Sequence, residues 1–193
     1  MKKYSLILLF LLLFFNTFSQ TTTDSFNYRV DLNELKMKTY EKDSTANALV
    51  LYEYGNSFIE QSHFNLVTEE KHKIKILNQE GFDKATITIY LYNNERASEK
   101  VKNIVATTYN LIDGKVTKTK LDAKKDVFNE KYDKNYTLVK FTMPNVKLGS
   151  VITYSYTLTS PFKFKYKGWN FQSNIPKLYS EYRTSIPGNC SII

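Results

Sequence analysis

The chain has 193 residues, a net charge of +8 from 27 Lys and Arg against 19 Asp and Glu, and a single cysteine. This length suits one domain with a core of ordinary size, and one cysteine excludes a fold held by several disulfides. A basic surplus can indicate nucleic-acid binding, but the N-terminal sequence indicates an exported protein, which does not normally meet nucleic acid.

Residues 1–20 have the parts of a secretory signal peptide. Lys2 and Lys3 form a positive start, residues 6–15 are apolar, and Ser19 is a small residue at the expected cleavage site. The apolar run is shorter than the ~20 residues of a membrane-spanning helix. We therefore expect an exported protein of the periplasm or outer cell envelope, without a transmembrane segment after cleavage.

The polar stretch 21–30 leads into DLNELKMKTYEKDS (31–44), which predicts one helix. Asp31 or Asn33 has a side chain suited to capping its first turn. One helical face would be shared by Leu32, Leu35, the aliphatic stem of Lys36 and Tyr40.

Beyond this helix, short runs of β-forming residues alternate with turn signals. LVLYEY (49–54) predicts a strand that stops at Gly55. Residues 58–77 predict two strands, or one strand with a bend near Ser62, and NQEGFD (78–83) predicts a turn.

Two later segments have clearer patterns. KATITIYLY (84–92) predicts a strand, and its alternation puts three residues on one apolar face: Ile87, Ile89 and Leu91. NIVATTYNLIDGKVTKTKL (103–121) predicts a hairpin, because Asp113-Gly114 is a strong two-residue turn signal. In all, about nine short strands with turns between them predict an all-β fold, a β-sandwich or a barrel, with one short N-terminal helix.

The segment KFTMPNVKLGSVITYSYTLTSPF (140–162) combines strand and turn signals. Pro144 ends one strand or marks a sheet edge, and Gly149 is free to take a positive φ. In the strand that follows, one set of side chains is expected in the core: Ile152, Tyr154, Tyr156 and Leu158.

Lysines alternate with apolar or aromatic residues in KHKIKI (71–76) and in FKFKYK (162–167). Period-two spacing puts one set in the core and the other in water. The pattern favours a solvated face of lysines over a polyanion-binding stripe.

Few residues have the chemistry of a catalytic or metal site. His63 and His72 lack a local metal-ligand spacing, and the adjacent Glu69 and Glu70 point to opposite faces of a strand. Cys190 lies near the end of the chain, with nothing downstream to form a site. We therefore expect no catalytic residue, no cofactor and no metal, and interpret His72 as a hydrogen-bonded core histidine.

The 15 Tyr, 13 Phe and one Trp leave one alternative open. Tyr and Phe are also preferred in strands, and most of them alternate as core residues would. A glycan- or peptide-binding module that uses an exposed aromatic sheet face therefore stays as the second hypothesis.

At TMPNVKLGSVITYSYTLTSPF (142–162) and WNFQSNIPKLYSEY (169–182) the chain resembles a known family. It is similar to the domain of unknown function that precedes a transglutaminase-like (papain-fold) domain in cell-envelope proteins of bacteroidete-type bacteria. The resemblance covers about residues 32–187. It implies an immunoglobulin-like sandwich in the envelope, and a downstream domain with a Cys-His-Asp constellation.

After Pro187 the sequence turns to GNCSII, and we expect a truncated copy without that second domain. The expected boundaries are a signal peptide at 1–20, a polar lead-in at 21–30, a β-sandwich at 31–187 and an atypical tail at 188–193. The resemblance implies an exported, non-catalytic module, normally the N-terminal accessory or docking domain of a transglutaminase-like envelope protein. Its partners would be that domain, or an envelope polypeptide or glycan.

Overall fold

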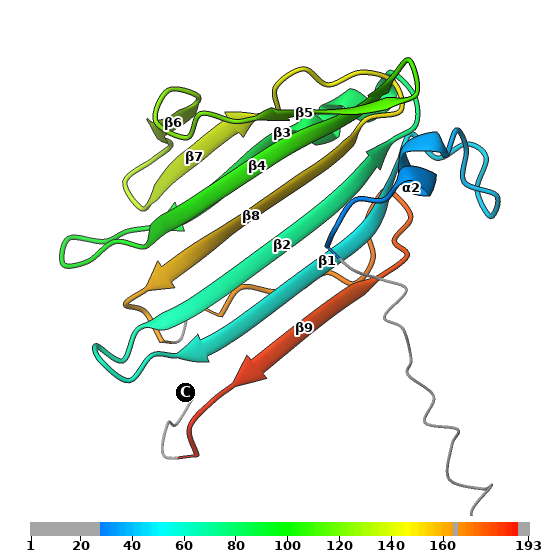
Figure 1. The fold of residues 1–193 in the computed structure, drawn as a ribbon. Helices are drawn as coiled ribbons and strands as arrows, with labels where there is room; N and C mark the ends of the chain where they lie inside the picture. Colours follow the sequence, from blue (N-terminus) through cyan, green and yellow to red (C-terminus); the bar gives the residue numbers. More distant parts are fainter. Residues whose placement is uncertain (1–27, 164–165, 189–193) are drawn as a thin grey trace, which may run out of the picture.

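The computed structural model describes residues 28–163 and 166–188, so the expected signal peptide and Cys190 lie outside the described part. Within it, nine strands form two sheets (Figure 1). The strands are β1 (Ala48–Ile59), β2 (Leu66–Ile76), β3 (Thr86–Tyr92), β4 (Lys100–Ile112), β5 (Lys115–Lys120), β6 (Val127–Lys131), β7 (Tyr136–Thr142), β8 (Val151–Ser160) and β9 (Ser180–Ser185). A short helix, α2 (Leu32–Lys36), precedes them, and a 3-10 helix, η2 (Glu80–Ala85), joins β2 to β3.

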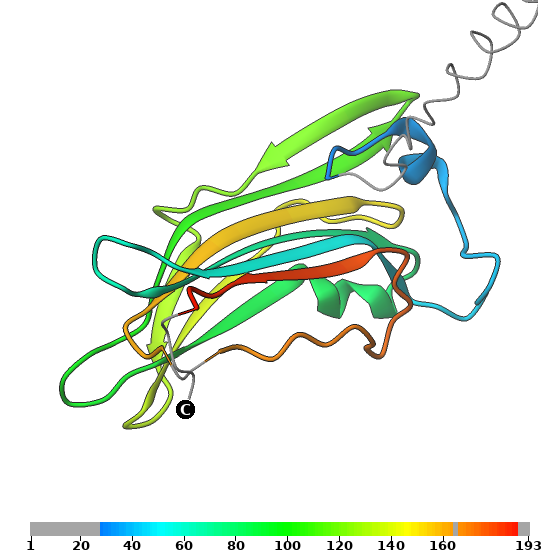
Figure 2. The ribbon, with the colours of Figure 1, turned by 90° about the horizontal axis from the view of Figure 1, so that it is seen from below.

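The larger sheet has the strand order β5-β4-β8-β2-β1-β9, and the smaller has the order β3-β7-β6. The predicted all-β sandwich is confirmed. Neighbouring strands are antiparallel except at one edge, where β9 runs parallel to β1. The chain reaches this edge through the crossing segment, residues 166–179, which runs along the inner side of the large sheet before it turns into β9 (Figure 2).

The main core lies between the two sheets. Alternate residues of β3 face inward, as predicted, and together with Val139 and Phe141 of β7 they meet the inner face of the large sheet. The largest buried side chains of this core include Ile76, Phe141, Ile152 and Leu158. The alternation on β8 predicted from sequence is therefore confirmed, with Tyr154 and Tyr156 packed at the margin of the same core.

A second, smaller core covers the outer face of the large sheet. Leu35 of α2 packs on Leu49, Leu51 and Val151. Asp31 caps the helix and forms a capping box with Glu34. The helix has only five residues, far fewer than the segment 31–44 predicted, because the backbone already leaves the helical region at the C-cap, Met37.

This second core corrects the prediction for the lysines. Lys71 is exposed as expected, but Lys73 is only 2% exposed and Lys75 is fully buried. The Nζ of Lys75 donates to the carbonyl oxygens of Leu35 (2.9 Å) and Gly149 (2.5 Å), and that of Lys73 pairs with Glu34. Alternation separates the two faces of a strand, but here the N-terminal segment covers the face that was expected in water.

Strand β1 also corrects a prediction, because it continues through Gly55 to Ile59. Gly55 is needed for close packing and not for a strand end. A Cβ at this position would lie 2.6 Å from Cζ3 of Trp169 and 2.7 Å from Cδ2 of Tyr182. A glycine inside a strand often marks such a close approach.

The turns follow the sequence signals. Asp113 (φ 50°) and Gly114 (φ 75°) form the two-residue turn between β4 and β5, and Gly149 has the expected positive φ of 78°. FKFKYK is different: it follows β8 as a connection, and no strand is found between β8 and β9 in the part of it that is described. The predicted strands otherwise lie where expected, within a few residues.

None of the helices in the described ranges is long and apolar enough to cross a membrane.

Candidate functional site

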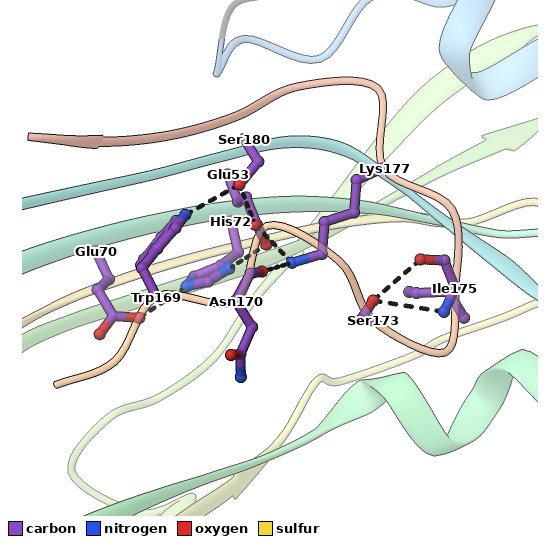
Figure 3. Close-up of polar contacts among 9 residues, drawn as sticks. All are labelled: Glu53, Glu70, His72, Trp169, Asn170, Ser173, Ile175, Lys177 and Ser180. Carbon is purple, nitrogen blue, oxygen red and sulfur yellow. Dashed lines mark hydrogen bonds and ion pairs between the residues drawn. The ribbon is translucent and has the colours of Figure 1, made fainter.

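A group of charged and aromatic side chains lies where the crossing segment passes over the inner face of β1 and β2 (Figure 3). We call it the His72 cluster. Its members are Glu53, Glu70, His72, Trp169, Lys177 and Ser180, and they come from β1, β2, the crossing segment and β9.

His72 is held between two aromatic rings. Its imidazole stacks on Tyr154, with ring centres 4.5 Å apart and planes 16° apart, and on Trp169 at 6.1 Å and 28°. Its Nε2 is 3.0 Å from Oε2 of Glu70, and its Nδ1 is 3.9 Å from Oε2 of Glu53. The predicted hydrogen bond of an inward-facing histidine is confirmed, although His72 is partly exposed and lies outside the main core.

Glu53 is buried and is the anchor for the crossing segment. Its Oε1 accepts hydrogen bonds from Nζ of Lys177 (2.6 Å) and from Oγ of Ser180 (2.5 Å). The same Ser180 oxygen accepts from Nε1 of Trp169 at 3.0 Å, and Lys177 also donates to the carbonyl of Asn170. Two side chains of the last third of the chain thus bind one carboxylate of β1 directly, and each of them makes one further contact with a residue of the crossing segment.

Trp169 closes this arrangement by packing flat against the backbone at Gly55. It stacks on Tyr182 of β9, with ring centres 5.2 Å apart and planes 14° apart. Both rings would collide with any side chain at position 55. Glycine at this position is what allows the indole to lie on the sheet.

The pKa values of Glu70 and Tyr156 are shifted in opposite directions. Burial by itself raises the pKa of the Glu70 carboxyl, but hydrogen bonds from His72 and Tyr156 and the charges of His72 and Lys167 together lower that pKa below its ordinary value. Burial first, and then the charge of Glu70, hold the pKa of Tyr156 well above its ordinary range. Near neutral pH, Glu70 is therefore ionised and Tyr156 keeps its proton to donate to it.

Seven residues of this region line a small hollow of about 190 Å³: Glu53, Glu70, His72, Gly168, Trp169, Asn170 and Lys177. The hydroxyl of Ser180 donates to Glu53, so within the described residues the cluster has no serine paired with His72 as an activated nucleophile would be. No group of three or more His, Cys, Asp or Glu in that part of the chain is placed to hold a metal ion. The arrangement can hold the crossing segment on the sheet by ion pairs, hydrogen bonds and stacking.

The residues singled out in the sequence do not form one site. His63 lies exposed in the turn between β1 and β2, with Nδ1 3.0 Å from Oγ of Ser62, while His72 is in the cluster. Glu69 is exposed and Glu70 faces inward, as their adjacency predicts. Sequence reasoning missed Glu53 and Lys177, although a charged residue in the apolar run LVLYEYG and a glycine inside that run were available signals.

A second surface with distinctive chemistry is the outer face of the small sheet. Tyr90 of β3 is 49% exposed, Phe128 of β6 is 64% exposed and Tyr132 after β6 is 60% exposed. The ring of Tyr90 lies 6.0 Å from that of Tyr132 and 6.5 Å from that of Tyr136, nearly perpendicular to both. We call Tyr90, Phe128, Tyr132 and Tyr136 the aromatic face.

The fold and the His72 cluster define a β-sandwich module whose last strand is locked in place by its own connection. The profile of the domain of unknown function DUF3857 matches residues 64–192, and the chain belongs to this family. None of the curated proteins with which the sequence was compared matches it.

Two solved structures are similar in part. One is described as "a putative protease" from Parabacteroides distasonis; it is 13% identical, with a TM-score of 0.52, and the match covers 72% of this chain and 28% of that one. The chain therefore spans less than a third of that protein, and at this identity the likeness concerns the fold alone. The other, yeast LTA4 hydrolase in complex with bestatin, is 12% identical over 67% of this chain and 19% of its own, and its TM-score of 0.30 carries no argument.

Proposed function

We propose that this protein is an exported, non-catalytic β-sandwich module, of the kind that accompanies a transglutaminase-like domain in the cell envelope and docks or presents it. The observation that carries the proposal is the His72 cluster. Its carboxylates, its imidazole and its lysine bind one another and the crossing segment, so these reactive groups serve to fasten the chain. The partial likeness to a larger protein described as a protease supports the pairing with a second domain.

A direct test is an activity assay on the purified mature chain. We expect no amidase or amine-transfer turnover above buffer with casein and a fluorescent amine as substrates. The variants His72→Gln, Glu70→Gln and Cys190→Ala form the matched set. A non-catalytic role would be contradicted if the wild-type chain shows turnover and one of these variants abolishes it.

Export is tested separately. We expect the mature chain in the periplasmic or outer-envelope fraction, with an N-terminus near residue 20 when it is sequenced. A variant with Lys2 and Lys3 changed to Glu is expected to stay in the cytoplasm, because the positive start of the signal is lost. An unprocessed chain in the cytoplasmic fraction of wild-type cells argues against export.

The aromatic face favours a second candidate function, the binding of a glycan. Three aromatic rings on one sheet face are each about half exposed or more, and the apolar faces of sugar rings can stack on them. Binding is measured by affinity electrophoresis in gels that contain soluble polysaccharide. Glycan binding would be supported if the polysaccharide retards the wild-type protein and if Tyr90→Ala and Tyr132→Ala abolish this retardation. The control is Phe64→Ala, which removes an exposed ring elsewhere.

A further inference from the structure

We propose that the end of the large sheet beside α2 carries a binding groove for a single acyl chain with an anionic head group. The groove has a volume of about 400 Å³, within the range of roughly 300–1,000 Å³ of small-molecule sites. It is formed by α2 and the residues after it, the ends of β2 and β4, and the loop between β7 and β8. This proposal is independent of the proposed function.

The groove has an apolar lining that is partly open to solvent, because Leu148 and Ile112 are exposed whereas Leu35 is buried. Six apolar residues contribute to it: Leu35, Met37, Leu77, Leu111, Ile112 and Leu148. Leu148 is 59% exposed, and Ile112 and the neighbouring Val116 are exposed as well. Covering this surface with an acyl chain would remove apolar area from water at roughly 25 cal/mol per Å².

Positive charge surrounds this lining. Lys36, Lys38 and Lys147 line the groove and are exposed, and no carboxylate lines it. None of these three lysines forms an ion pair in the described ranges. The acidic residues nearby either have another partner or lie outside the groove. Asp31 caps α2, Glu34 pairs with Lys73, and Asp113 lies in the exposed hairpin turn.

A fourth positive charge lies directly behind the groove wall. The buried ammonium of Lys75 donates to the carbonyls of Leu35 and Gly149, and both of these residues line the groove. An anionic head group at this wall would gain attraction from Lys75 in a region of low dielectric. The charge pattern therefore selects an anion over a neutral or cationic head.

The polar atoms of the groove favour an acyl chain over a peptide. Asn110, the uncharged polar side chain of the lining, already donates to the carbonyl of Asn145 (3.0 Å) and accepts from Oγ of Ser150 (2.5 Å). A peptide backbone needs partners for its own amides when it is buried, whereas an acyl chain needs none.

The test uses calorimetric titration of the mature chain with sodium decanoate below its micelle concentration. We expect saturable one-to-one binding to decanoate, and none to acetate or to decyltrimethylammonium. Lys147→Glu and Leu148→Gln are each expected to weaken binding at least about fivefold, since one reverses a rim charge and the other removes apolar contact.

Lys125→Glu is the matched control, because Lys125 is an exposed lysine away from the groove. Circular dichroism confirms the fold of each variant, and Lys38→Glu replaces any that does not fold. Equal binding of decanoate and decyltrimethylammonium, or binding that the groove variants leave unchanged, overturns the proposal. So does binding to phosphatidylglycerol vesicles with no binding of decanoate, which would indicate a membrane-surface contact instead.

Discussion

Lys75 is completely buried, and its ammonium donates hydrogen bonds to main-chain carbonyls. Burial lowers the pKa of Lys75 from 10.5 to about 8, and the charge of Glu34 opposes this shift only in part. Between these two values the unfolded chain binds more protons than the folded one. Folding stability must therefore rise with pH across that window.

We predict that the free energy of unfolding contributed by this lysine increases by about 2 kcal/mol from about pH 7.5 to about pH 9.5. Tyrosines of the unfolded chain, whose ordinary pKa is about 10, already ionise in part at the upper bound, so the contribution of Lys75 is taken as the difference between the wild-type and Lys75→Met slopes. Urea titrations at a series of pH values measure the slope. Lys75→Met should flatten it, whereas Lys71→Met, an exposed lysine of the same strand, should leave it intact; equal slopes for all three proteins would refute the buried charge.

Gly55 offers a second prediction at the scale of one residue. Gly55→Ala forces the rings of Trp169 and Tyr182 away from β1, at a cost of about 1–3 kcal/mol. Trp169 is the one tryptophan of the chain, so its fluorescence reports the displacement directly. We expect an emission shift towards longer wavelength and a lower urea midpoint.

The matched control is Gly168→Ala, next to the same tryptophan, where an added Cβ meets nothing within 4 Å. It should change neither the emission nor the midpoint appreciably. An unchanged spectrum in Gly55→Ala would mean that the indole does not lie on the backbone.

Among the strands, β8 is the one for which the sequence predicted the inward-facing residues most completely. Ile152 is completely buried, and its Cα partners are Ile74 on β2 and Thr108 on β4. We predict that Ile152→Asp costs several kcal/mol, roughly the 3–5 kcal/mol of an unpaired buried charge. The control is Thr159→Asp, because Thr159 is half-buried and lies opposite Lys100. It should cost less than about 1 kcal/mol of folding stability in the same thermal melts. Similar losses of stability in the two variants would mean that β8 has another register.

Strands and turns could be predicted where the signal is local. The alternation of Ile87, Ile89 and Leu91, the turn at Asp113-Gly114 and the positive φ of Gly149 depend on neighbours in the chain. The burial of Lys73 and Lys75 could not be predicted in this way. Period two separates two faces, but it does not tell which face another segment covers.

The His72 cluster was beyond sequence reasoning for the same reason. His72 was placed correctly on the inner face, because its own strand decides that. Glu53 and Lys177 lie 124 positions apart and meet only because β9 returns beside β1. The parallel pairing of β9 and the crossing segment depend on this long-range return, which no local pattern records.

At the scale of the whole molecule, the crossing segment and β9 protect an edge. Without them, β1 would be a 12-residue edge strand, and Glu53 would lose its partners Lys177 and Ser180. Long unprotected edges pair with other chains. We predict that a variant ending at Phe162 self-associates, whereas one ending at Pro187 stays monodisperse.

Size-exclusion chromatography with light scattering distinguishes the two outcomes. A monomeric short variant with the melting temperature of the longer one would show that β9 is dispensable. Adding Tyr54→Lys to the short variant should reduce its association, because a charge on an exposed edge opposes pairing.

The parallel direction of β9 also sets the distance between the two ends of the module. The β9 strand ends beside Phe58, near the turn that follows β1, whereas the lysine-lined groove lies where β1 begins. A strand of 12 residues is about 40 Å long. Any polypeptide joined after β9 would therefore leave from the pole opposite the groove, and the sandwich would act as a rigid spacer that keeps the two attachments apart.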